Sequence, residues 1–303
     1  MTYEEQADLL ASRGLKCDRA ALIAHLEAVS YYRLSGYLYP YQNDDDTFKD
    51  GACFDEAWNS YTFDRRFRLV VLDAIERVEV YIRSRLAYEL SHLQGPFGYL
   101  ERNNLPGLSD DEYDQFIIKA KQCFKRCHEP FADHFKKKYG DAHELPPYWV
   151  IVESFDFGLV SKLYKGAPKS IRKAIANELG VQMPVLASWL HTINTIRNMC
   201  AHHARLWNKV LGYKPIVPKG DTKWDYVRTH NNKVFAVLSI LNYLLATIAP
   251  DSKWKCRLIT LLEEYPHIDK SRMGFPEGWQ ISPLWAPSEA GATVATKRQC
   301  SRG

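Results

Sequence analysis

Residues 54–93, FDEAWNSYTFDRRFRLVVLDAIERVEVYIRSRLAYELSHL, form the stretch of the chain that decides the fold. Apolar residues recur there at steps of three and four positions: Phe67, Val71, Ile75, Val78, Ile82, Leu86 and Leu90. This spacing places them along one side of an α-helix. Asp73 and Arg77 are an acid and a base four positions apart, a pairing that also favours a helix. The sequence therefore predicts one long amphipathic helix whose apolar side faces a core.

Outward from this helix, the chain shows further helical patterns and no convincing strand alternation. Shorter helical stretches are expected at residues 3–30, 109–126, 129–138, 149–165, 169–179, 185–207, 230–249 and 252–264. Glycine and proline separate many of them, as helix ends require. The prediction is an all-α fold, a helical bundle with additional helices and no substantial sheet.

The helical patterns extend through most of the chain and indicate a single domain over residues 1–286. Within it we expect an N-terminal helical part of about 1–145 and a motif-bearing part of about 146–286. Residues 287–303 are mostly small and polar, which is typical of a disordered tail.

The composition is that of an ordinary globular protein, with 46% hydrophobic and 25% charged residues. A net charge of +4 permits nucleic-acid binding without requiring it. The seven cysteines show no disulfide framework, and no apolar secretory signal begins the sequence. No apolar run reaches the length of a membrane span. We therefore expect a cytoplasmic protein that does not associate with a membrane.

Basic and aromatic residues provide candidate contacts to RNA. They are Arg65, Arg66, Arg68 and Arg83 on the long helix, Lys136, Lys137 and Lys138 farther along, and Tyr37 in a stretch of five tyrosines at 31–41. The alternative for the arginines is a solvated or ion-paired face. The alternative for the tyrosines is core packing, and their exposure decides between packing and base stacking.

The expected helix at 185–207 gathers residues that could carry chemistry. Its apolar stripe consists of Trp189, Ile193, Ile196, Cys200, Ala204 and Trp207. Another face carries His191, Asn194, Asn198, His202 and Arg205, with Arg197 beside it and neither Lys nor Glu among them. Guanidinium groups bind phosphate, imidazoles titrate near neutral pH, and amides orient both. The alternative is a polar interface or a hydrogen-bonded network within a bundle.

RNA cleavage needs few chemical groups. A base removes the 2′-OH proton, that oxygen attacks the adjacent phosphorus, and a cation stabilises the added charge. An arginine and a histidine can supply these functions without a metal, so no cofactor is expected. Cys123, Cys127 and His128 have half of a zinc-site pattern, but the second half is missing. We therefore expect no metal site.

Four segments, in order along the chain, resemble the Abi-like family of bacterial abortive-infection proteins, the AbiD/AbiF group. The segments are Tyr32–Tyr37 with Tyr39 and Pro40; Phe63–Leu90 with Asp64, Arg65, Arg68, Glu76 and Arg83; Pro147–Tyr164; and Arg197–Asn208, which reads RNMCAHHARLWN. The resemblance covers roughly residues 3–285. The family is similar to the HEPN superfamily of helical domains, in which an Arg-x4–6-His motif commonly forms a composite RNase site where two copies meet.

The resemblance implies an all-α HEPN-type protein with a role in phage defence and a site at this motif. It identifies Arg197 as the motif arginine, Asn198 as the polar residue after it and His202 as the motif histidine. It also implies homodimerisation and RNA as a substrate, or as a structured small RNA in a toxin–antitoxin or defence system. His191, Asn194, His203 and Arg205 are candidate supporting residues.

Three hypotheses follow for the function. In the first, the protein is a metal-independent endoribonuclease in which His202 transfers protons, Arg197 holds the scissile phosphate and Asn198 orients one of them. In the second, the same face binds a structured small RNA without cutting it. In the third, the protein is a scaffold that binds other proteins. His203 falls beside the apolar stripe, and it joins the site only if the helix breaks near Ala201.

Overall fold

The computed structural model describes residues 1–286, and the predicted disordered tail at 287–303 lies outside them. Within the described residues the protein is helical and contains no strand, so the all-α prediction is confirmed. The helices are α1 (Tyr3–Ser12), α2 (Arg19–Val29), α3 (Tyr31–Leu38), α4 (Phe54–Gln94), α5 (Asp110–Arg126), α6 (Pro130–Tyr139), α7 (Tyr148–Ile151), α8 (Phe157–Gly166), α9 (Lys169–Glu178), α10 (Met183–Ala201), α11 (Asp225–Arg228), α12 (Val234–Ile248) and α13 (Trp254–Glu264).

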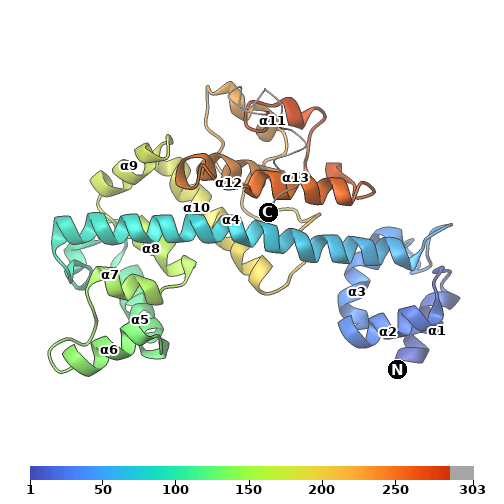
Figure 1. Cartoon of the computed structure of the whole chain (residues 1–303), viewed down its shortest axis with the longest axis horizontal. Coiled ribbons are helices and arrows are strands. Elements are labelled where there is room, and N and C mark those ends of the chain that lie inside the picture. Colours follow the sequence, from blue (N-terminus) through green and yellow to red (C-terminus); the bar gives the residue numbers. More distant parts are fainter. Residues whose placement is uncertain (287–303) are drawn as a thin grey trace.

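Helix α4 confirms the prediction made from residues 54–93. It has 41 residues, so it is about 60 Å long, and it runs the length of the molecule in Figure 1. Its predicted apolar stripe, from Phe67 to Leu90, is fully buried. The helix stops at Gly95, whose φ of 77° favours glycine, and Pro96 follows directly.

The remaining helices pack along α4. Helix α3 contacts α4 near its N-terminal end, and α7, α8 and α9 contact it near its C-terminal end (Figure 1). Helices α10, α12 and α13 pack against the stretch between. Helix α4 is therefore the element that links the N-terminal helices to the rest of the chain.

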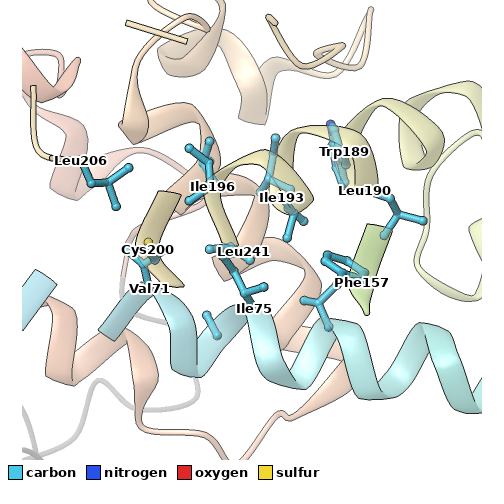
Figure 2. Close-up of a cluster of buried hydrophobic side chains, with 14 of the residues drawn as sticks. Val71, Ile75, Phe157, Trp189, Leu190, Ile193, Ile196, Cys200, Leu206 and Leu241 are labelled. Atoms are coloured by element: carbon cyan, nitrogen blue, oxygen red, sulfur yellow. The ribbon is translucent and has the colours of Figure 1, made fainter. Parts of the chain in front are cut away.

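Helix α10 buries one side in the hydrophobic core. Figure 2 shows side chains from α4, α8, α10 and α12 meeting in one cluster: Val71, Ile75, Phe157, Trp189, Leu190, Ile193, Ile196, Cys200 and Leu241, with Leu206 beside them. Ten of the 15 residues of α12 are buried, which explains its apolar sequence. None of the helices within residues 1–286 combines the length and apolar character that a membrane crossing requires. The core thus fixes α10 along its apolar side.

The predicted helix at 185–207 is shorter than expected, because α10 ends at Ala201. Ala204 and Trp207 therefore do not continue its apolar stripe, and Arg205 does not lie on its polar face. The helical-wheel placement is wrong for every residue after Ala201. The chain turns away there because the residue that follows the C-cap, His203, adopts a left-handed conformation.

Candidate functional site

The end of α10 is a complete Schellman motif. The N–H of Ala204 donates to the carbonyl of Met199 at 2.8 Å, and the N–H of His203 donates to that of Cys200 at 3.1 Å. His203 stands at the left-handed position with a φ of 58°, where glycine is the usual residue. A bulky residue in this conformation is strained, and such strain is commonly found at functional sites.

The motif residues are exposed around this helix end. Asn198, His202 and His203 are exposed, and the side chain of Arg197 is 35% exposed. The break in the helix at Ala201 turns His203 away from the buried stripe, so two adjacent imidazoles face solvent. Burial raises the pKa of the Cys200 thiol to about 12, so this cysteine stays protonated at neutral pH and is no nucleophile. The accessible chemistry at the helix end is therefore that of arginine, amide and imidazole.

Arg197 points toward an acidic side chain of α4. Its Nε lies 3.8 Å from Oε2 of Glu79, whose other oxygen accepts a hydrogen bond from Arg83 at 2.7 Å. Burial raises the pKa of Glu79, against the opposing attraction of Arg83 and Arg197. The sequence spacing of Glu79 and Arg83, four positions apart, favours their ion pair, but it does not predict the contact of Glu79 with Arg197. Glu79 limits where the Arg197 guanidinium can lie.

A buried carboxylate behind the site holds the chain after the helix break. Asp64 accepts hydrogen bonds from the backbone N–H groups of Leu206, at 3.1 Å, and Trp207, at 2.8 Å. It is fully buried and also accepts from the Tyr37 hydroxyl at 2.7 Å and from Arg68. Burial raises the pKa of the Asp64 carboxyl, whereas Arg68 and the hydrogen bonds favour its charged form. We call Asp64, Arg68 and Tyr37 the Asp64 cluster.

The Asp64 cluster corrects two predictions. Arg68 is 4% exposed and Tyr37 is 3% exposed, so neither is placed to contact RNA. Their polar atoms are used inside the protein, where a buried polar group needs a partner. Arg68 is an ion-paired core residue, and Tyr37 is a core residue whose hydroxyl binds Asp64.

Two side-chain hydrogen bonds join helix α3 to the segment after α10. Arg33 donates to the carbonyl of His203 at 2.8 Å, so it contacts the strained residue directly. Arg205 donates to the carbonyl of Gly36 in α3. These contacts place α3 beside the two histidines, although more than 160 residues separate them in sequence.

The other predicted supporting residues are split between different surroundings. The ring of His191 packs edge-on against Tyr213, with centroids 4.6 Å apart. Asn194 lies against α8, where a Cβ added to Gly158 would come within 3.5 Å of Asn194 Nδ2. Arg205 contacts α3 rather than the helix face. Arg197, Asn198, His202 and His203 therefore belong to the last turns and the end of α10, whereas His191 and Asn194 lie earlier on α10 and Arg205 contacts α3.

The remaining predicted RNA contacts fall into two classes. The engaged ones are Arg83, which binds Glu79 and the carbonyl of Phe155; Arg66, which binds Glu264; and Lys136, which binds the carbonyl of Cys127. The exposed ones are Arg65, Lys137 and Lys138. The two lysines lie on α6, which Figure 1 places at the opposite end of α4 from α3. Arg65 and Arg66 are both exposed and lie next to Asp64 on α4, but Arg66 is paired with Glu264.

Within residues 1–286, no three His, Cys, Asp or Glu side chains are grouped so that they could hold a metal ion. Cys123, Cys127 and His128 thus do not gain a further ligand from elsewhere among these residues.

Comparison with known protein families gives a match over much of the chain. A family model described as Abi-like protein matches residues 24–208, which is more than half of the 303-residue chain. The match begins in α2 and ends just beyond the segment that Asp64 holds. No curated protein and no solved structure matches the chain.

Proposed function

The chain belongs to the Abi-like protein family, and on that premise we propose that it is a metal-independent endoribonuclease of the HEPN type. Family membership supports a role in abortive infection, that is, defence against phage. The observation that carries the nuclease proposal is the exposed end of α10. There, Asn198, His202 and a conformationally strained His203 are exposed, and Arg197, whose side chain is 35% exposed, lies five residues before His202.

The proposed reaction is transesterification through the RNA 2′-OH. A neutral imidazole accepts the 2′-OH proton, O2′ bonds to phosphorus, and the bond from phosphorus to the 5′ oxygen breaks. A protonated imidazole donates a proton to that leaving oxygen, so the products are a 2′,3′-cyclic phosphate and a 5′-OH. His202 takes one of these roles. Arg197 stabilises the charge that develops on the phosphorane oxygens, and Asn198 orients Arg197 or His202.

Two histidine functions are needed, and two sources can supply the second. One is His203 of the same chain, which the helix break exposes. The other is His202 of a second copy, as the resemblance to HEPN proteins implies for a homodimer. If the second imidazole is His202 of the partner, a mixed dimer of wild-type and His202→Ala chains has only one of the two imidazoles and should be inactive. If it is His203 of the same chain, each wild-type chain keeps its own site and the mixed dimer should retain about half of the cleavage.

The test is cleavage of single-stranded RNA with EDTA present, after co-purified nucleic acid has been removed. Wild-type protein, Arg197→Ala and His202→Ala are compared with His134→Ala, which replaces an exposed histidine on α6. We expect wild type and His134→Ala to cleave and the two motif variants to lose cleavage by at least about 100-fold, the usual contribution of a general acid–base group. Equal cleavage by all four proteins would contradict the proposal.

A second candidate function is binding of a structured small RNA without cleavage. It is favoured by the contact of Arg197 with Glu79, which engages part of the arginine's charge within the chain. Under this hypothesis stripped wild-type protein binds RNA tightly and leaves it intact. Binding to RNA then weakens as salt rises, whereas a protein-binding scaffold shows little such dependence.

A further inference from the structure

Two tyrosines of the stretch at 31–41 are exposed to an unusual degree. Tyr32 is 90% exposed and Tyr39 is 73% exposed, although Tyr37 between them is buried. Tyrosines offer large apolar faces, so nearly complete exposure of two of them in one segment needs an explanation beyond packing.

The two exposed tyrosines stand on the same side of one helical segment. Tyr32 and Tyr39 are seven positions apart, and Tyr39 continues the helical backbone of α3. Seven residues are two turns, so both side chains leave the same face about 10 Å apart along the axis. Ser35, with a small side chain, and Gly36, with none, fall between them on that face, and a Cβ on Gly36 would lie 3.8 Å from the Arg205 guanidinium. We call Tyr32, Ser35, Gly36 and Tyr39 the α3 saddle.

A cavity of about 430 Å³ opens beside the α3 saddle. Ser35, Gly36 and Tyr39 line it, together with Arg205, which follows α10, and with Arg13 and Asp46. Arg13 lies 3.9 Å from Asp46, so this part of the rim offers both a hydrogen-bond donor and an acceptor. Such a mixed rim suits the edge of a nucleobase better than it suits a phosphate, which a carboxylate repels.

The α3 saddle joins the candidate nuclease site directly. Arg33, next to Tyr32, donates to the carbonyl of His203 at 2.8 Å, and Arg205 donates to the carbonyl of Gly36. A strand lying across the saddle therefore passes beside the two exposed imidazoles. Arg33 is exposed, so it can also meet the phosphates of that strand.

We propose that the α3 saddle binds unpaired nucleotides of an RNA strand by stacking on Tyr32 and Tyr39. The spacing of about 10 Å matches three stacking steps of about 3.4 Å, which leaves room for two bases between the rings. Paired bases of a duplex already stack on one another and do not offer their faces. The saddle thus selects single-stranded segments next to the α10 end. The proposal rests on the proposed function only for RNA as the ligand, and not for cleavage.

The experiment measures binding of a 20-nucleotide single-stranded RNA by fluorescence anisotropy, with a blunt duplex of the same sequence as comparison. Both RNAs carry 2′-fluoro groups, so that no 2′-OH is present and cleavage cannot interfere. The full chain is used as wild type, Tyr32→Ala, Tyr39→Ala and Tyr39→Phe. Tyr88→Ala is the matched control, because Tyr88 is 55% exposed near the other end of α4.

Each alanine variant at the saddle should weaken binding of the single strand by roughly 5- to 150-fold, the range for loss of one stacked base. Tyr39→Phe keeps the ring and should stay within about twofold of wild type, as should Tyr88→Ala. Equal affinity of wild type and both alanine variants for the single strand would overturn the proposal, as would equal loss of duplex binding.

The outcomes separate this proposal from the nuclease proposal. If natural RNA stays intact but Tyr39→Ala loses binding of the 2′-fluoro single strand, the saddle stands and the nuclease hypothesis fails. If natural RNA is cleaved through His202 but Tyr32→Ala and Tyr39→Ala bind the 2′-fluoro strand like wild type, the nuclease stands and the saddle fails.

Discussion

The Asp64 cluster and the end of α10 contain similar residue types in opposite surroundings. In the cluster, Asp64 and Arg68 are almost completely buried, and Asp64 accepts hydrogen bonds from side chains and backbone alike. At the end of α10, Asn198, His202 and His203 are exposed and their side chains are not used to hold the fold. The backbone N–H groups that Asp64 binds, those of Leu206 and Trp207, follow His203 by only a few residues.

This difference distinguishes buried charged groups that stabilise the fold from exposed groups that are free to react. Removal of one partner of a buried ion pair leaves the other charge buried and unpaired, which strongly lowers the stability of the fold. An exposed imidazole beside a rigid core contributes little to stability and stays free to bind and transfer protons. The account therefore predicts that substitutions in the cluster change folding and substitutions at the helix end change chemistry.

The largest effect on stability is expected for Asp64→Asn. The amide cannot neutralise Arg68. If its oxygen accepts from the backbone N–H groups of Leu206 and Trp207, its NH2 group faces Arg68, and two donors then oppose each other. Breaking a buried pair in this way should lower the free energy of unfolding by about 3–5 kcal/mol, measured by urea denaturation. Asp114→Asn, an exposed acid on α5, is the control and should change it by less than about 0.5 kcal/mol. Equal effects of the two substitutions would show that Asp64 does not lock the segment after α10.

A substitution between the two regions, Glu79→Gln, tests how the interior positions Arg197. Because Gln lacks the charge that attracts Arg197, RNA cleavage should fall roughly tenfold, equivalent to about 1.4 kcal/mol. The fold should persist, since Arg83 still binds the carbonyl of Phe155 and Glu153. Unchanged cleavage would mean that Glu79 does not position the arginine.

The stability of wild type relative to Glu79→Gln should also depend on pH. Burial raises the pKa of Glu79 above its ordinary value of 4.5, so the folded state binds the proton more tightly than the unfolded state. The contribution of Glu79 to stability is thus fully present below pH 4.5 and is lost as the pH rises through the raised pKa. The free energy of unfolding of wild type relative to Glu79→Gln should therefore decline over that window. A relative stability that rises with pH would show that the ion pairs outweigh burial.

A smaller and opposite effect is expected for His203→Gly. Glycine adopts a φ of 58° without strain, so the free energy of unfolding should rise by about 0.5–1 kcal/mol. Ala201→Gly, two positions earlier within α10, should lower it by a similar amount. Cleavage by His203→Gly then tells whether the imidazole takes part in proton transfer. Loss of stability in His203→Gly would contradict the strain argument.

The smallest effect on folding is expected for Arg65→Ala, because this exposed side chain contacts solvent. Its free energy of unfolding should change by less than about 0.5 kcal/mol. If Arg65 contacts a phosphate, the slope of log affinity for RNA against log salt should fall by about 1. Arg66→Ala is the comparison, since Arg66 is already paired with Glu264 and should leave the slope unchanged. Identical slopes for wild type and both variants would remove Arg65 from the RNA surface.

The sequence predicts the periodic parts of the fold well and the aperiodic parts poorly. The apolar repeat from Phe67 to Leu90 gives α4 directly, because three- and four-residue spacing has one structural meaning over such a length. The end of α10 could not be found this way. A histidine takes the place of the usual glycine at position 203, so the residue that normally marks a helix end is missing.

The sequence pattern also does not predict which polar residues are buried. Tyr31 to Tyr41 contains both core and solvent-exposed tyrosines, and residue type alone does not distinguish Tyr37 from Tyr39. Asp64 lies among charged residues on α4, and its burial depends on backbone N–H groups more than 140 positions away. Only tertiary contacts of this kind decide which charged residues are structural.

Parallel measurement of RNA cleavage and thermal stability in wild type, Arg197→Ala, His202→Ala and Asp64→Asn tests the central claim most directly. We predict that the two motif variants lose cleavage by at least about 100-fold while their Tm stays within a few degrees of wild type. Asp64→Asn should have the lowest Tm of the four proteins. A His202→Ala protein that cleaves RNA like wild type, or that unfolds as readily as Asp64→Asn, would contradict the assignment of the exposed α10 end as the site of chemistry.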